Sequence, residues 1–365
     1  MSDMKKICFA LVAALCVPGV AMAQETQRLT ANKLNEYGLI YSLPVTHLNV
    51  EIEAVKTVKK AGPYYKYAKK YLGVGNVVTE DSQTWDIKEV SISPKGVPDK
   101  ENEYLMKFKS GSAPFLLLDE AGLPLAINTE VEESVVKRKR NKYADKDVFE
   151  GMDYANVFSE DMVASESTMK RAEAAAQKIF ELRESRNDLV SGNADQMPPD
   201  GQSLKLMLDE LSRQESVLTA MFIGTTQTET KVFRYDYLPT GDVSNEILLR
   251  VSDFDGIVDK NDLSGEPVYL SLTVTEKGEL PVDEKGESKK LPKGAVMYCI
   301  PGKAEVTLKY KGNVIAHESV EVSQFGVEHG LEPKMFTDKK SPAYVIFNPE
   351  SGSIREIGTI ETVAE

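Results

Sequence analysis

The sequence predicts an α+β fold, with two β-rich domains and an antiparallel helical hairpin between them. Hydrophobic side chains recur with a period of 2 in the first part of the chain, with a period of 3.6 in the middle, and with a period of 2 again toward the end. The short period is typical of half-buried strands and the longer one of amphipathic helices. The two changes of period therefore divide the chain into three regions.

The expected domain boundaries follow these changes. A signal peptide is expected at 1–23, and an N-terminal β-rich domain with one short helix at 24–145. A linker and the helical hairpin are expected at 146–224, and a C-terminal β-rich domain at 225–365. Roughly 340 residues remain without the signal, which is more than one hydrophobic core usually holds.

The N-terminal region contains the clearest strand, at residues 45–58. There the apolar side chains of every second residue would lie on one face, namely Leu48, Val50, Ile52 and Ala54. Pro63 and Gly73 mark the start and the end of a short helix. Further strands are expected at 84–92, 104–109, 115–118 and 123–127, the last two joined by a turn at 119–122.

Two amphipathic helices are expected in the middle, at 168–186 and 203–222, with a loop rich in proline and glycine between them. Asp200 is the candidate N-cap of the second helix. The first apolar stripe is mostly alanine, whereas the second is bulkier and contains Leu204, Leu208, Leu211, Leu218 and Met221.

Because the two stripes differ in bulk, we expect a further surface to cover part of the second one. A protein partner or the second copy of a homodimer would serve, and so would the β-rich domains of the same chain. Leu204, Leu208 and Leu211 are therefore candidate binding residues.

Strand patterns return at 230–237, 246–251, 268–275, 304–310, 314–322 and 344–347. The chain then turns at 348–352 into a last strand at 353–357. This terminal hairpin is similar to the one at 118–125, because both have an acidic turn closed by glycine. An internal duplication and a chance similarity of two hairpins both remain open.

The first residues read as an export signal. Lys5 and Lys6 precede an apolar run at 7–17, and Ala21-Met22-Ala23 is typical of a cleavage site. No cysteine lies at the junction after Ala23, so we expect a soluble periplasmic or extracellular protein and not a lipoprotein. No later stretch is long and apolar enough for a transmembrane segment.

The net charge and the cysteine content argue against nucleic-acid binding and against an internal disulfide. The formal net charge of −13 argues against nucleic acid as a partner, since phosphate neutralisation needs a basic surface. Cys8 and Cys16 would leave with the signal, so Cys299 cannot form an internal disulfide in the mature chain. Its strand-forming neighbours indicate a buried thiol and not a reactive one.

Several segments resemble one known family. They are the run from Gly62 to Gly73 followed by 80–85, the helical stretches 178–186 and 206–211, and the segment 263–269. These are similar to exported Bacteroides-type proteins of an uncharacterised domain-of-unknown-function family, family 4831. The resemblance covers nearly the whole mature chain and implies a Gram-negative periplasmic setting. It implies no activity and no catalytic residue.

Metal and cofactor motifs are weak. The segment Asp253–Asp262 is rich in oxygen ligands suited to Ca²⁺, but its spacing does not fit an EF-hand, and a solvated acidic loop is the alternative. His47, His317 and His329 are not spaced as ligands of one transition metal. We therefore expect no metal site and no cofactor, while calcium at this segment stays open.

Catalytic motifs are equally weak. There is no Gly-x-Ser-x-Gly elbow, and no glycine-rich loop opens a helix after a strand. A glycoside hydrolase would need only two carboxylates, so this class remains open in a chain with 57 acidic residues.

Two surfaces are candidates for binding. Tyr64, Tyr67 and Tyr71 would share a helix face suited to a protein or a glycan, unless that face seals the N-terminal β core. The basic run 137–142 suits either an anionic lipid surface or a solvated linker. The leading hypothesis is a non-enzymatic periplasmic or outer-membrane-associated binding or assembly protein. A carbohydrate-active hydrolase that uses a carboxylate pair is the alternative.

Overall fold

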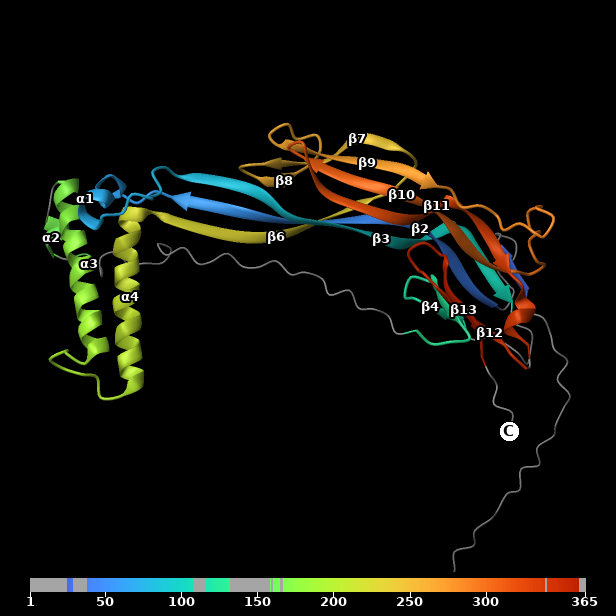
Figure 1. Cartoon of the computed structure of the whole chain (residues 1–365), viewed down its shortest axis with the longest axis horizontal. Helices are drawn as coiled ribbons and strands as arrows, with labels where there is room; N and C mark the ends of the chain where they lie inside the picture. Colours follow the sequence, from blue (N-terminus) through green and yellow to red (C-terminus); the bar gives the residue numbers. More distant parts are fainter. Residues whose placement is uncertain are drawn as a thin grey trace, which may run out of the picture.

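A computed structural model of the chain shows an elongated molecule, with packed β-sheets at one end and a bundle of helices at the other (Figure 1). The structure describes residues 25–28, 38–107, 116–131, 158, 160–164, 167–338 and 340–360. The expected signal at 1–23 and the basic run 137–142 lie outside these residues.

The described strands form three antiparallel sheets. The arm sheet has the order β1-β3-β2-β6, with β1 at Glu25–Arg28, β3 at Ser82–Lys107, β2 at Gly38–Lys60 and β6 at Thr225–Tyr237. The cover sheet has the order β11-β10-β9-β7-β8, with β11 at Asn313–Leu331, β10 at Val296–Tyr310, β9 at Glu266–Glu276, β7 at Val243–Ser252 and β8 at Gly256–Val258. The end sheet has the order β13-β12-β5-β4, with β13 at Ile354–Thr359, β12 at Ala343–Phe347, β5 at Pro124–Ile127 and β4 at Leu116–Leu118.

The described helices gather at the far end of β2, β3 and β6 (Figure 1). They are α1 at Ala68–Leu72, α2 at Glu160–Ala164, α3 at Thr168–Ser191 and α4 at Gly201–Ile223, with a short 3-10 helix at Tyr65–Tyr67. A second 3-10 helix, at Pro333–Phe336, packs with the end sheet instead. The Asp200 side chain caps α4 by accepting hydrogen bonds from the backbone N–H groups of Gln202 and Ser203, each at 2.8 Å. These bonds, with that of the Ser203 backbone as the largest cause, lower the pKa of Asp200.

The arm sheet and the cover sheet pack face to face. The four residues that alternate along β2, from Leu48 to Ala54, are fully buried, as the period of the sequence predicts. They face a row from β7, β9, β10 and β11 that includes Leu249, Leu270, Val306 and Val322. This sandwich is the largest core among the described residues.

A second core lies where β2, β3 and β10 meet the end sheet. The rings of Tyr41 and Tyr104 stack with centroids 5.7 Å apart, beside Phe347 and Ile127. The Tyr41 hydroxyl accepts a hydrogen bond from the Met297 backbone N–H at 2.8 Å. Burial raises the pKa of Tyr41, so its hydroxyl stays protonated and remains available for hydrogen bonding.

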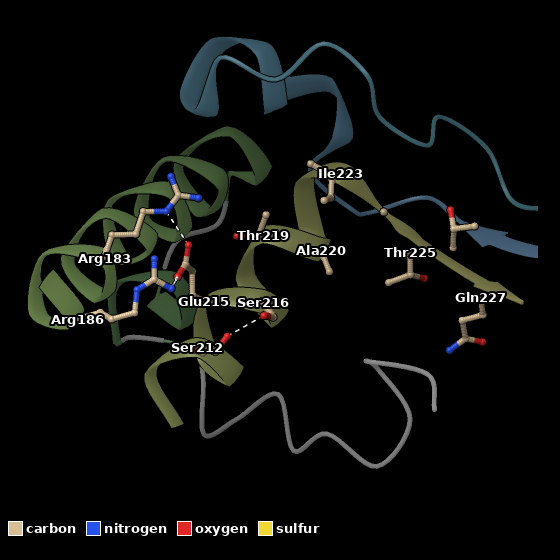
Figure 2. Close-up of a pocket in the computed structure, with 12 residues that line it drawn as sticks. Arg183, Arg186, Ser212, Glu215, Ser216, Thr219, Ala220, Ile223, Thr225 and Gln227 are labelled. Atoms are coloured by element: carbon tan, nitrogen blue, oxygen red, sulfur yellow. Dashed lines mark hydrogen bonds and ion pairs between the residues drawn. The ribbon is translucent and has the colours of Figure 1, made fainter. Parts of the chain in front are cut away.

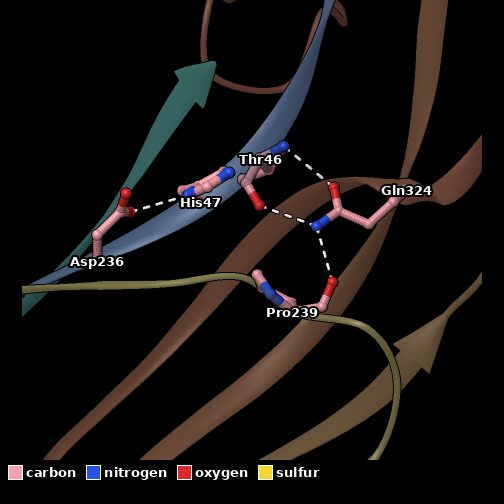
Figure 3. Close-up of polar contacts among 5 residues, drawn as sticks. All are labelled: Thr46, His47, Asp236, Pro239 and Gln324. Carbon is pink, nitrogen blue, oxygen red and sulfur yellow. Dashed lines mark hydrogen bonds and ion pairs between the residues drawn. The ribbon is translucent and has the colours of Figure 1, made fainter. Parts of the chain in front are cut away.

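Polar groups tie the arm sheet to the cover sheet between these two cores (Figure 3). The Thr46 backbone N–H lies 3.0 Å from both Ser323 Oγ and Gln324 Oε1. Gln324 Nε2 in turn donates to the carbonyl oxygens of Thr46 and Pro239, each at 2.9 Å. A side-chain amide thus pairs with main-chain groups at a point where the strand ladders are interrupted.

The strand pairing does not follow the expected division into two β-rich domains. β6 pairs with β2, and β5 pairs with β12, so strands from before and after the helices share sheets. The sandwich core also takes side chains from both regions. The fold is β-rich with a few helices, which agrees with the α+β class, and the arrangement of two β-rich domains around a hairpin is not confirmed.

Two further observations concern the expected strands at 84–92 and 104–109 and the two similar hairpins. The strand expected at 84–92 and the described part of the one expected at 104–109 belong to one strand, β3, which passes through Pro94 and Pro98. β1 pairs only with Tyr104–Lys107, so the prolines lie where one side of β3 needs no donor. The two similar hairpins, β4–β5 and β12–β13, lie side by side in the end sheet through the β5–β12 pair.

Candidate functional site

A cavity of about 590 Å³ lies where α3 and α4 meet the start of β6 (Figure 2). Ligand pockets in proteins commonly occupy about 300–1,000 Å³. The cavity is lined by Arg183, Arg186, Ser212, Glu215, Ser216, Thr219, Ala220, Ile223, Gly224, Thr225, Thr226 and Gln227. Most of these side chains are polar, and two of them are cationic.

Two arginines of α3 share one carboxylate of α4 in this cavity. Arg183 Nε lies 2.7 Å from Glu215 Oε1, and Arg186 Nη1 lies 2.6 Å from Glu215 Oε2. The Glu215 side chain is only 14% exposed, whereas those of Arg183 and Arg186 are 40% and 37% exposed. The group therefore carries one surplus positive charge on the solvent side.

Two polar atoms of residues that line this cavity have no hydrogen-bond partner. They are the Thr219 hydroxyl oxygen on α4 and Gln227 Nε2 on β6, and both atoms are buried. A buried polar atom without a partner costs about 1–3 kcal/mol, so such atoms often mark a place that a ligand or a water occupies.

Gly224 shapes the end of the cavity that joins α4 to β6. Its φ of 80° and ψ of −174° lie in a region that essentially only glycine adopts. A Cβ at this position would meet Lys60 O at 2.5 Å and Val78 Cβ at 2.7 Å. The sharp change from helix to strand therefore depends on glycine at this position.

A second hollow of about 560 Å³ lies toward the free end of the helical hairpin, where α3 and α4 are joined by the loop 192–200. Its apolar residues include Leu189, Leu206, Met207 and Leu211, and its acidic residues are Asp188, Asp195 and Glu210. Leu206 is 63% exposed and Met207 45% exposed. We call this hollow the hairpin groove.

One of the candidate leucines of α4, Leu211, lies between the hairpin core and the groove. Leu204, Leu208 and Leu211 are half-buried, and Leu211 lines the hairpin groove. The more exposed Leu206 and Met207 lie off the stripe that predicted the binding residues. They were missed because a helical stripe identifies the buried face and says nothing of apolar residues beside it.

The candidate tyrosines pack against the helices and not against the sandwich. Tyr64 is buried, with its ring 5.5 Å from that of Phe222 on α4. Tyr67 and Tyr71 are half-buried, with ring centroids 6.2 Å apart, against the same cluster. These rings fix the loop between β2 and β3 to the hairpin. They therefore cover the core of the helices and not the core of the sandwich.

The acidic segment Asp253–Asp262 is partly a strand, since β8 occupies Gly256–Val258. Asp259 Oδ1 accepts hydrogen bonds from Asn261, and the Ser264 backbone N–H lowers the pKa of Asp262. Over the described ranges, no three His, Cys, Asp or Glu side chains gather closely enough to hold a metal ion.

Two of the three histidines lie beside carboxylates, and the third lies beside a tyrosine ring. His47 lies 3.0 Å from Asp236 (Figure 3), and His317 lies 3.2 Å from Glu305. His329 is buried, with its ring 6.1 Å from that of Tyr298.

Cys299 is buried in β10, and burial, with Glu328 and Glu321 nearby, raises its pKa to about 12. We expect a thiol reagent to label the chain that starts at Gln24 slowly at pH 8 and at once in urea. Because the thiol pKa is higher in the folded state than its ordinary value of 9.0, this group favours folding below pH 9 and loses that contribution as the pH rises toward 12. Fast labelling of the native protein would contradict this assignment.

The comparisons place the chain in a family. A family model described as "Domain of unknown function (DUF4831)" matches residues 37–355. The chain belongs to this family. None of the curated proteins and none of the solved structures with which the DUF4831 chain was compared matches it.

Since the family description gives no activity, function has to be argued from the geometry of the DUF4831 chain. The cavity offers one carboxylate, Glu215, which two arginines already bind, whereas glycoside hydrolysis needs two carboxyl groups across the scissile bond. In the hairpin groove, hydrogen bonds from Arg213 and Gln214 lower the pKa of Glu210 to about 2, opposite to the shift that a general acid needs. No described helix combines the length and the hydropathy needed to cross a bilayer.

Proposed function

We propose that this DUF4831 protein is a non-enzymatic binding or assembly protein that holds a protein partner in its hairpin groove. We further propose that it works in the periplasm or outside the cell, soluble or associated with the outer membrane, after cleavage behind Ala23. The signal-like pattern of residues 1–23 and the resemblance to exported Bacteroides-type proteins support this location.

The exposed apolar side chains at the free end of the hairpin are the observation that carries the proposal. Leu206 and Met207 are exposed on α4, and they line the groove together with Leu189 of the neighbouring helix α3. A cluster of exposed large hydrophobic side chains costs solubility, and such clusters are typical of interaction sites.

The charges around the groove indicate the chemistry of the partner. Asp188, Asp195 and Glu210 line the groove, so a segment with apolar side chains next to Lys or Arg would complement it. The arm of β2, β3 and β6 holds the hairpin away from the sandwich (Figure 1).

Site-specific photocrosslinking in the producing cell tests this function. A photoreactive residue at position 206 is expected to give one discrete crosslinked product, whose peptide in the partner is apolar with basic neighbours. The matched control is position 263, since Leu263 is 83% exposed but lies on a loop of the cover sheet. The same sample should begin at Gln24 if the signal is cleaved. Crosslinks at 206 that stay within the chain, or that equal those at 263, would refute the proposal.

A further inference from the structure

We propose that the cavity between α3, α4 and β6 is a second binding site, which takes a small polar molecule through its carboxylate group. This site is separate from the hairpin groove, so its existence does not depend on a protein partner. Arg183, Arg186, Thr219 and Gln227 are the residues assigned to it.

The first argument is charge. Glu215 neutralises one of the two guanidinium groups, and one positive charge remains in a chain whose net charge is −13. Each arginine gives Glu215 a single N–H donor, at 2.7 Å for Arg183 and at 2.6 Å for Arg186. The other N–H groups of the two guanidinium groups meet no acceptor among the described residues. A planar guanidinium matches a carboxylate well, so a monoanion would balance both charge and donors.

The second argument is the pair of buried polar atoms without partners. Gln227 Nε2 can only donate, so it calls for an acceptor oxygen, and the Thr219 hydroxyl can donate or accept. A ligand with hydroxyl or carbonyl groups beyond its carboxylate would satisfy both atoms. The other polar lining residues, among them Ser212 and Thr226, suit the same kind of molecule.

The third argument is size. At about 590 Å³ the cavity is much larger than a bare inorganic ion requires, and its lining also includes Ala220 and Ile223. A polyhydroxy carboxylic acid or an amino acid fits this volume and polarity better than phosphate or sulfate.

A purely structural role of the Arg–Glu cluster predicts a different response to mutation. If the two arginines only tie α3 to α4, Glu215→Gln should weaken the hairpin and leave anion binding absent. If they hold a ligand, Glu215→Gln releases both guanidinium groups and should tighten binding, because a competing carboxylate is gone.

Calorimetric titration of the purified chain from Gln24 onward tests the site. The probes are gluconate and glutamate, with sorbitol as the uncharged analogue and inorganic phosphate as the other oxyanion. We expect a carboxylate probe to bind and sorbitol not to bind. Arg186→Gln should weaken binding about tenfold or more, and Glu215→Gln should strengthen it several-fold. Lys178→Gln, which removes an exposed charge from the same helix outside the cavity, should change affinity less than about twofold.

Each remaining outcome counts against the proposal. No binding of either carboxylate at about 10 mM would overturn it, and so would equal binding by wild type and Arg186→Gln. Binding of phosphate without either carboxylate would overturn the assigned ligand class. If Arg186→Gln loses helix content by circular dichroism, Arg183→Lys and Glu215→Gln still decide the matter. Loss of the crosslink at position 206 with normal titration would reject the proposed function alone.

Discussion

Replacing Gly224 by alanine is expected to lower the free energy of unfolding by about 3 kcal/mol or more, through backbone strain and a direct clash. The residue combines a φ of 80° with a ψ of −174°, and a Cβ would lie 2.5 Å from Lys60 O, a backbone atom of β2. To relieve this clash, the end of α4 would have to move away from the end of β2. We therefore expect loss of the junction between the helices and the arm sheet. Urea unfolding followed by far-UV circular dichroism measures the change.

Gly192→Ala is the matched control. Gly192 ends α3 with a φ of 77° and a ψ of 18°, and a Cβ there would meet no atom within 4 Å. Its replacement should cost only the left-handed backbone conformation, about 1–2 kcal/mol. Equal losses in the two variants would show that the close approach at Gly224 contributes nothing.

Replacing Phe222 by alanine is expected to cost about 3–5 kcal/mol. The side chain is fully buried, and its ring lies 5.5 Å from that of Tyr64, so the substitution leaves a hole between α4 and the loop before β3. We expect the helical signal to be lost at lower urea concentration than in the wild type, because this ring joins the helices to the arm.

Phe180 provides the comparison within the same group of helices. It lies on α3 and is 47% exposed, so Phe180→Ala should cost less than about 1 kcal/mol. Similar midpoints for the two variants would contradict the role given to Phe222.

Local structure could be predicted from the sequence wherever a period was long and regular. The alternation from Leu48 to Ala54 gave the buried face of β2, and the spacing of Ala172, Ile179 and Leu182 gave that of α3. The pairing of β2 with β6 and of β5 with β12 could not be predicted, because alternation identifies the buried face of a strand and not its neighbour. This is why two separate β domains were expected.

The candidate sites show the same limit. Tyr64, Tyr67 and Tyr71 were found from their spacing, but their partner, Phe222, is distant in the sequence. Arg183 and Arg186 lie off the predicted apolar stripe of α3, and their spacing of three residues puts them on one side of the helix. Both side chains reach Glu215 on α4 because of how α3 and α4 are positioned along each other. Side-chain packing between the two helices sets this position, and the spacing within one helix does not reveal it.

The end sheet has a consequence for the order in which the chain folds. β5 pairs with β12 through Ile127 and Val345, which are about 220 residues apart in the sequence. The edge of β5 that pairs with β12 therefore stays unpaired until nearly the whole polypeptide has been made. Contacts of such long range close slowly, and an open strand edge favours association with other chains. A chain that ends before Ala343 lacks β12 and β13 and would keep the edge of β5 exposed. We therefore expect such a chain to aggregate more readily than the full chain.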